Sequence, residues 1–278
     1  MIVRGLRSFS RVVILLGLLL FGSQVEASDT QTFNGRSLIV HAPTQLPAAG
    51  ARALVIVLHG GLGNAERIAD KQSESGLNMD DEADRNGFIV AYLNGTPVTR
   101  LTSARMFGWN AGGGCCGMSA QNNIDDVAYV SEAVADLVSR YGVDPSKVYG
   151  MGHSNGAMMV QRMVCETRVL AAVVAVSGPL NVENPTCPGA RGRRILAIHG
   201  ARDENVPVTG GVGTKGLSHV AYQSEDSARR AFTAAGAEYR LQIVPDADHK
   251  LEHIDAAIKS AEGVTIARKA TDFFGLSR

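Results

Sequence analysis

The chain has 278 residues, of which 45% are hydrophobic and 19% charged, with 27 basic and 27 acidic side chains. This balance of charge gives no electrostatic reason to expect a nucleic acid or a membrane surface as the partner. The length and the apolar content suit one α/β domain with a large core.

The first 27 residues are typical of an export signal. Three arginines are followed by an apolar run at residues 12–21 and by a small-residue cleavage site at residues 25–27. The apolar run is shorter than the roughly 20 residues that span a bilayer, so we expect cleavage and no membrane anchor. We therefore expect an exported protein, secreted or periplasmic, whose mature catalytic domain covers residues 28–278.

Apolar and amphipathic runs alternate along the rest of the chain. Continuous Val, Ile and Leu runs separated by helix-length stretches predict a mostly parallel sheet with helices on both faces, a fold of the α/β class. Strands are predicted at residues 36–41, 53–59, 88–93, 147–151, 171–176, 194–199 and 239–244, and helices at residues 125–141, 155–166 and 223–235.

Residues 94–123 interrupt this alternation. The segment is rich in glycine and has little periodicity, and loops of this length are uncommon and often functional. We therefore expect it to cover the active site. Asp125 and Asp126 follow it at the start of a predicted helix, where capping is the expected role and a paired carboxylate site is the alternative.

The cysteines are Cys115, Cys116, Cys165 and Cys187. An even number in an exported chain indicates two disulfides. Because neighbouring cysteines rarely bond to each other, we expect Cys115 and Cys116 each to pair with one of the other two. Free thiols are the alternative, and a zinc site lacks the usual C-x-x-C spacing.

The pentapeptide from Gly152 to Gly156 has the G-x-S-x-G pattern, with Ser154 at its centre. It lies between a strand-like run and a helix-like run, which is the setting of a nucleophile elbow. A serine hydroxyl becomes a useful nucleophile when a tight turn exposes it beside a base and near amide donors. A glycine-rich turn that only caps the helix is the alternative.

An acid and a base follow two later strands. Asp203 comes after the run at residues 194–199 and His249 after the run at residues 239–244. In a parallel sheet the reactive groups collect at the carboxyl ends of the strands, so the chain order Ser154, Asp203, His249 predicts a serine hydrolase triad. Glu204 is the alternative acid.

A tetrahedral oxyanion needs two amide donors. The N–H of Asn155, at a helix N-terminus, is the first that we expect. The second comes from the glycine turn after the strand at residues 53–59, with Gly61 favoured over Leu62. His153, beside the nucleophile, is expected to line the substrate pocket, and packing on the elbow is its alternative role.

A second motif overlaps the predicted base. Residues 249–253 read H-x-x-E-H, the inverted zinc-peptidase motif, with Glu252 as the base and His249 and His253 as ligands. That motif requires a helix carrying both histidines. Pro245 before it makes His249 a loop residue, so we expect no metal.

These residues resemble the exported polyhydroxybutyrate-depolymerase-like and feruloyl-esterase-like carboxylesterases of the α/β-hydrolase fold. The resemblance covers about residues 36–250, and one departure is that Asp248-His249-Lys250-Leu251 stands where the family usually has Gly-His-x-Trp-Pro. It implies a cofactor-free serine esterase with Ser154, Asp203 and His249 as triad, and Trp109 near the acyl pocket. The resemblance rests on Leu58 to Gly61, Gly87 to Tyr92, Trp109-Asn110-Ala111, Cys115-Cys116-Gly117, Asp125-Asp126-Val127, Gly152 to Gly156, Ile198-His199-Gly200, Asp203 and Val206-Pro207.

The leading interpretation is an exported carboxylic-ester hydrolase that acts through an acyl-enzyme on a hydroxyalkanoate oligomer or polymer, or on a hydroxycinnamoyl ester. A peptidase or acyltransferase with the same triad is the alternative within the fold. A non-catalytic exported binding protein is the alternative outside it. Specificity is expected to lie in residues 94–123 and 208–219.

Overall fold

The structure is a computed structural model that describes residues 1, 28–99, 105–216 and 218–278; the predicted export signal lies outside these residues. The main sheet contains β1 (Asp29–Phe33), β2 (Arg36–His41), β3 (Arg52–Leu58), β4 (Ile89–Leu93), β7 (Val143–His153), β8 (Ala172–Val176), β9 (Arg194–Gly200) and β12 (Glu238–Val244). The helices are α1 (Ala65–Ala69), α2 (Asp80–Asn86), α3 (Gly117–Gln121), α4 (Asp126–Tyr141), α5 (Asn155–Glu166), α6 (Glu225–Ala234), α7 (Leu251–Glu262) and α8 (Ile266–Phe274). Two short ribbons pair β5 (Thr96–Pro97) with β6 (Phe107–Gly108) and β10 (Gly211–Val212) with β11 (Ala221–Tyr222).

The main sheet has the strand order β1-β2-β4-β3-β7-β8-β9-β12. Strand β2 is antiparallel to β1 and β4, and every other neighbouring pair is parallel. The carboxyl ends of six strands therefore meet at one edge of the sheet, where the loops after β3, β7, β9 and β12 lie together. The predicted α/β fold with a mostly parallel sheet is confirmed.

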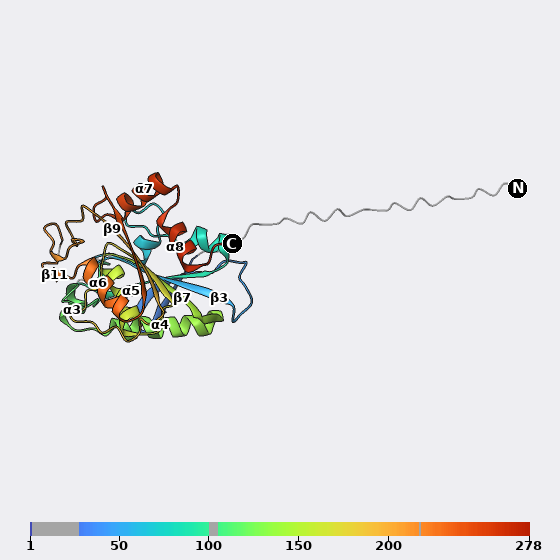
Figure 1. Ribbon diagram of the computed structural model, residues 1–278. Helices are drawn as coiled ribbons and strands as arrows, with labels where there is room; N and C mark the ends of the chain where they lie inside the picture. The colour runs from blue at the N-terminus through green and yellow to red at the C-terminus, as the bar shows by residue number, and fades with distance from the viewer. Residues whose placement is uncertain (2–27, 100–104, 217) are drawn as a thin grey trace.

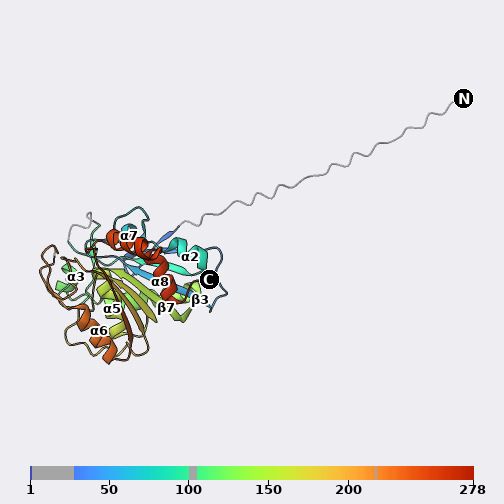
Figure 2. The ribbon, with the colours of Figure 1, turned by 45° about the horizontal axis from the view of Figure 1, so that its top comes forward.

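Helices cover both faces of this sheet (Figure 1). Side chains alternate along β3, so Leu54 and Ile56 join one core with α4, α5 and α6, while Val55 and Val57 join a second core with α1, α2, α7 and α8. Figure 2 shows α7 and α8 over one face and α5 and α6 over the other. Burial on both faces explains why the central strands are continuous apolar runs.

The structure adds elements to the predicted ones. Strand β1 was not predicted because four of its five residues are polar and Phe33 is its one apolar residue, at the exposed edge beside β2. Strand β7 begins at Val143, four residues earlier than predicted. The segment at 94–123 contains β5, β6 and α3, and the N–H of Phe107 donates to the carbonyl of Gly63 over 2.9 Å, which holds the segment against the loop after β3.

Asp125 and Asp126 have different roles. The Asp125 carboxylate accepts from the N–H of Ala128 at 2.9 Å, so the predicted cap of α4 is confirmed. Asp126 is fully buried, pairs with Arg36 at 2.6 Å and accepts from the N–H of Asn110 at 2.6 Å. Capping therefore describes only the first carboxylate, and the second ties the long loop to β2.

The predicted disulfide connectivity is wrong. The structure pairs Cys165 with Cys187 and Cys115 with Cys116. Cys165 lies in the last turn of α5, and the chain returns to place the Cα of Cys187 only 4.0 Å from its own, so this partner is already taken. The prediction relied on the rarity of disulfides between adjacent cysteines. That rule could not reveal that the chain after α5 folds back and brings Cys187 next to Cys165.

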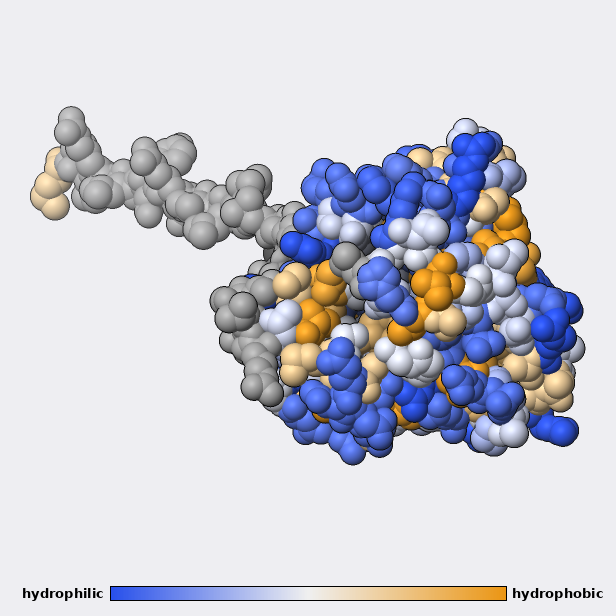
Figure 3. All heavy atoms as spheres, turned by 90° about the vertical axis from the view of Figure 1, so that its left-hand side faces the viewer, coloured by the Kyte–Doolittle hydropathy of each residue, from blue (hydrophilic) through white to orange (hydrophobic). Residues whose placement is uncertain are grey.

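Among the described residues no helix is long and apolar enough to span a bilayer. Figure 3 shows the face on which α3 and β11 lie, and its apolar side chains form separate patches among hydrophilic ones.

Candidate active site

The elbow forms where β7 meets α5. Ser154 has φ 54° and ψ −119°, a strained backbone that lifts its side chain out of the turn. A Cβ on Gly152 would overlap the backbone of Gly156, and a Cβ on Gly156 would overlap the carbonyl oxygen of Leu58. The elbow therefore requires glycine at both positions, because the end of β7, the turn and the neighbouring β3 are in direct backbone contact.

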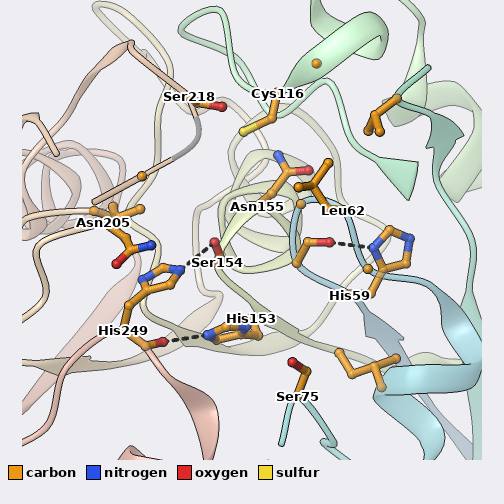
Figure 4. A pocket seen from close by; sticks show the side chains of 18 of the residues that line it. His59, Leu62, Ser75, Cys116, His153, Ser154, Asn155, Asn205, Ser218 and His249 are labelled. Carbon is orange, nitrogen blue, oxygen red and sulfur yellow. Dashed lines mark hydrogen bonds between the residues drawn. The ribbon is translucent and has the colours of Figure 1, made fainter. Parts of the chain in front are cut away.

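Side chains from three loops meet at the elbow, and Figure 4 shows two of them, Ser154 and His249. The Nε2 atom of His249 lies 2.9 Å from Oγ of Ser154, and Nδ1 of the same ring lies 2.7 Å from Oδ2 of Asp203. Glu204, the alternative acid, is exposed and pairs with Lys215. The structure thus brings together Ser154, Asp203 and His249 in the arrangement of a nucleophile, a base and an orienting acid.

Asp203 is buried, yet its carboxylate is well supplied with donors. Oδ1 accepts from the N–H groups of Asn205 and Val206 at 2.9 and 2.8 Å, and Oδ2 faces both His249 and His199. Burial alone would raise the pKa of Asp203, but the hydrogen bonds from His199 and His249 outweigh it and hold this pKa far below its usual range. The residue is a fixed anion at every pH at which the protein would work.

The two predicted amide donors, Gly61 and Asn155, line the same cavity as Ser154. A Cβ on Gly61 would be 3.8 Å from that of Asn155, so the glycine turn and the start of α5 are in contact. The carbonyl of Gly60 accepts from Nδ1 of His59 at 2.7 Å and from the N–H of Gly63 at 3.0 Å. Because a trans peptide directs its C=O and N–H oppositely, the N–H of Gly61 points away from those two groups. Leu62, the other candidate, lines the same cavity.

A cavity of about 410 Å³ opens above the elbow, within the range of small-molecule sites. Both segments that were expected to set specificity contribute to it, Val98 and Cys116 from one and Gly216 and Ser218 from the other. Tyr222 of β11 adds an aromatic wall. Apart from its histidines, Arg67 is the one ionisable side chain among the described lining residues with a full charge at neutral pH.

His153 lines the cavity as expected, and it also holds the base. Its Nε2–H donates to the backbone carbonyl of His249 over 2.9 Å (Figure 4). Burial, together with the positive charge on His249 when that ring is protonated, lowers the pKa of His153 to about 3. A neutral ring beneath His249 positions the loop without repelling the imidazolium that catalysis would form.

Trp109 occupies a different place from the one expected. It is fully buried and does not line the cavity; its Nε1–H donates to the carbonyl of His59 over 3.0 Å. The side chain of Asn155 also makes two hydrogen bonds to the backbone of Trp109: Oδ1 accepts from the Trp109 N–H at 2.7 Å, and Nδ2 donates to the Trp109 carbonyl at 3.0 Å. Trp109 thus fastens the long loop to the elbow and to the glycine turn.

The H-x-x-E-H segment does not assemble a metal site. His249 precedes α7 and turns toward Ser154, whereas His253 is exposed on α7 and contacts Asp248 at 2.9 Å. No cluster of three metal-ligating side chains occurs in residues 28–99, 105–216 and 218–278. The motif in the sequence is therefore split between a loop and a helix surface.

Sequence reasoning assigned no role near the triad to His199 or Glu225. His199, at the carboxyl end of β9, contacts both Asp203 and Glu225. The one signal in the sequence is its place four residues before the acid, at the edge where reactive groups gather.

Residues 40–250 match the phospholipase/carboxylesterase family, which is three quarters of the chain. The chain belongs to that family. A feruloyl esterase B of Piromyces equi is 30% identical over 186 residues, which cover 64% of this chain and 31% of that protein. A bifunctional acetylxylan esterase/xylanase of Neocallimastix patriciarum is 27% identical over 171 residues, 61% of this chain and 22% of that protein. The chain spans less than half the length of both relatives.

Solved structures show the same fold. A carboxylesterase of Bacillus cereus has a TM-score of 0.60 at 12% identity, covering 87% of this chain and 94% of that one. An acetyl xylan esterase of Aspergillus awamori has a TM-score of 0.59 at 14% identity, covering 91% and 100%. The family membership and these neighbours confirm the expected resemblance to esterases of the α/β-hydrolase fold.

Proposed function

We propose that the protein is a serine carboxylesterase in which Ser154 is the nucleophile, His249 the base and Asp203 the orienting acid. The observation that carries the proposal is the continuous pair of contacts, 2.9 Å from Ser154 to His249 and 2.7 Å from His249 to Asp203, at the floor of a ligand-sized cavity. The proposed mechanism needs no metal or organic cofactor, because the three side chains supply nucleophile, base and acid.

Acylation begins when Oγ of Ser154 attacks the ester carbonyl carbon and its proton moves to Nε2 of His249. The carbonyl oxygen becomes an oxyanion that accepts from the N–H groups of Gly61 and Asn155. When the tetrahedral intermediate collapses, the bond to the alcohol oxygen breaks and His249 protonates that oxygen. Water then attacks the acyl-enzyme, with His249 taking its proton, and the carboxylic acid leaves as Ser154 is restored.

The proposed substrates are esters of compact acyl groups, acetyl and hydroxycinnamoyl. The cavity of about 410 Å³ and the names of the relatives, feruloyl esterase and acetylxylan esterase, support this range. We also propose that the protein is exported, because its N-terminal residues have the pattern of a cleaved signal.

The test is Ser154→Ala, measured on acetyl, butyryl, hydroxycinnamoyl and oligo-hydroxybutyrate esters. We expect the purified, folded variant to lose at least about a thousandfold in kcat/KM, because triad members act as a unit. His249→Ala should behave alike, while His253→Ala, the matched histidine on the exposed face of α7, should retain most activity with or without a chelator. Residual activity above about a tenth in Ser154→Ala would refute the proposal.

A further inference from the structure

Behind the triad acid lies a row of buried polar side chains that no step above uses. His199, fully buried at the end of β9, has Nε2 at 3.1 Å from Oδ2 of Asp203 and 2.9 Å from the carbonyl oxygen of Val206. Its Nδ1 lies 2.7 Å from Oε1 of Glu225, and the other oxygen of Glu225 accepts from the hydroxyl of Tyr239 at 2.5 Å. The contacts run unbroken from Ser154 through four further side chains to Tyr239.

The protons in this row can be assigned from the partners. A backbone carbonyl only accepts and Asp203 is an anion, so Nε2 of His199 carries a hydrogen. On the other side, Glu225 begins α6 directly after the N-cap Ser224, and its Oε2 accepts from the Tyr239 hydroxyl while its Oε1 faces Nδ1 of His199. An ionised Glu225 requires a hydrogen on Nδ1 as well. The ring of His199 is then an imidazolium between two carboxylates.

The titration behaviour of His199 agrees with this assignment. Burial lowers the pKa of His199, but its hydrogen bonds to Asp203 and Glu225 outweigh burial and raise this pKa to about 9. Asp203 and Glu225 are the two carboxylates that contact His199; His249 lies on the other side of Asp203, and the neighbouring His153 stays neutral. Since the folded-state pKa lies above the ordinary 6.5, the imidazolium stabilises the fold below pH 6.5, and this contribution disappears as the pH rises toward 9.

We infer that His199 is a positioning residue for the triad, an imidazolium at neutral pH that orients Oδ2 of Asp203 toward His249 and limits how strongly Asp203 stabilises the protonated base. The inference rests on the proposed function, because Oδ2 is shared between the two rings. A cation on the far side of Asp203 weakens the pull of this carboxylate on the His249 proton.

Glu225→Gln tests the charge of the row. The amide keeps the size of the side chain but leaves His199 with only one carboxylate, so its ring becomes neutral at working pH and Asp203 attracts the His249 proton more strongly. We expect the acidic limb of the kcat/KM profile to move to higher pH by about half a unit or more. Asp226→Asn is the matched control, since it removes a carboxylate from the next, exposed position of α6, which pairs with Arg229 and Arg230; its profile should coincide with that of the parent.

His199→Gln separates charge from packing. Its amide still donates to Asp203 but carries no charge, so the acidic limb should move in the same direction as in Glu225→Gln. A merely structural role would lower the melting temperature of both variants and leave the acidic limb of both profiles where the parent has it. That result would overturn the inference.

Nitrogen-15 NMR of the histidine-labelled parent protein needs neither activity nor a variant that folds. We expect both ring nitrogens of His199 to be protonated at pH 7.5 and to titrate near pH 9. A neutral ring at pH 7.5 would overturn the inference even if Ser154→Ala proves that the esterase exists. Conversely, a charged His199 in a protein without esterase activity would refute the proposed function alone.

Discussion

Gly156 is the residue with the least room in the elbow. We predict that Gly156→Ala inactivates the enzyme because the added methyl group displaces the elbow and the Ser154 that it carries. The added methyl group would meet the carbonyl oxygens of Leu58 and His59, the latter at 2.6 Å, and buried backbone cannot yield as a flexible side chain can. We expect a loss of at least about 2 kcal/mol in the free energy of unfolding, measured by urea denaturation. Gly61→Ala is the control for folding, because its methyl group would meet only Asn155 at an ordinary 3.8 Å. Equal stability of the two variants would contradict the steric reason given for Gly156.

For single residues, the sequence was most informative where the chemistry needs a fixed pattern. Ser154, Asp203 and His249 could be placed because an elbow, a strand order and a chain order restrict the choices. Trp109 could not be placed correctly, since a tryptophan in a glycine-rich loop fits a pocket wall as well as a buried anchor. Only the carbonyl of His59 and the amide of Asn155, brought close by the fold, decide between them.

The long loop between β4 and α4 depends on that anchor, and Trp109→Phe tests it. The phenyl ring fills most of the space, but the carbonyl of His59 loses its donor inside the protein. We expect the unfolding free energy to fall by about 1–3 kcal/mol, with a smaller effect on acyl specificity than on stability. A changed preference among the acyl groups at unchanged stability, found by comparing melting curves with kcat/KM across the ester panel, would restore the original idea of a substrate contact.

The Cys165–Cys187 bridge closes the connection that follows α5, and its removal should weaken the fold but spare the chemistry. In the chain-entropy model, a bridge over 22 residues lowers the entropy of the unfolded chain and thereby raises the free energy of unfolding by about 3 kcal/mol. We therefore predict a lower melting temperature for Cys187→Ser together with near-parental kcat/KM at 25 °C, since no atom of the bridge lines the cavity. Peptide mapping without reductant checks the connectivity, and a peptide joining Cys187 to Cys115 or Cys116 would contradict it.

For the whole molecule, the fold class followed from hydropathy alone, because central parallel strands buried on both faces must be continuous apolar runs. The strand order and the edge strand β1 did not follow, since they depend on which segments pair across long distances in the chain. The arrangement of the two specificity segments around the cavity likewise arises from contacts such as that between Phe107 and Gly63. The periodicity of a sequence depends on residues that are close along the chain, so it cannot predict which distant segments come into contact in the fold.

The position of β12 in the sheet has a consequence for how activity is lost on heating. This strand lies at one edge of the sheet and pairs only with β9. Its Leu241 and Ile243 are exposed, and the loop after it carries His249. Ser154 and the glycine turn at residues 60–61 follow the interior strands β7 and β3, which we expect to open only when the molecule unfolds as a whole. Edge segments open locally at lower free energy, so we predict that esterase activity falls several degrees below the midpoint of global unfolding. Amide hydrogen exchange should show β12 exchanging first, and exchange of β12 and β7 at one common rate would contradict it. The enzyme would then lose its base while its nucleophile is still held in place, a reversible inactivation that cooling undoes.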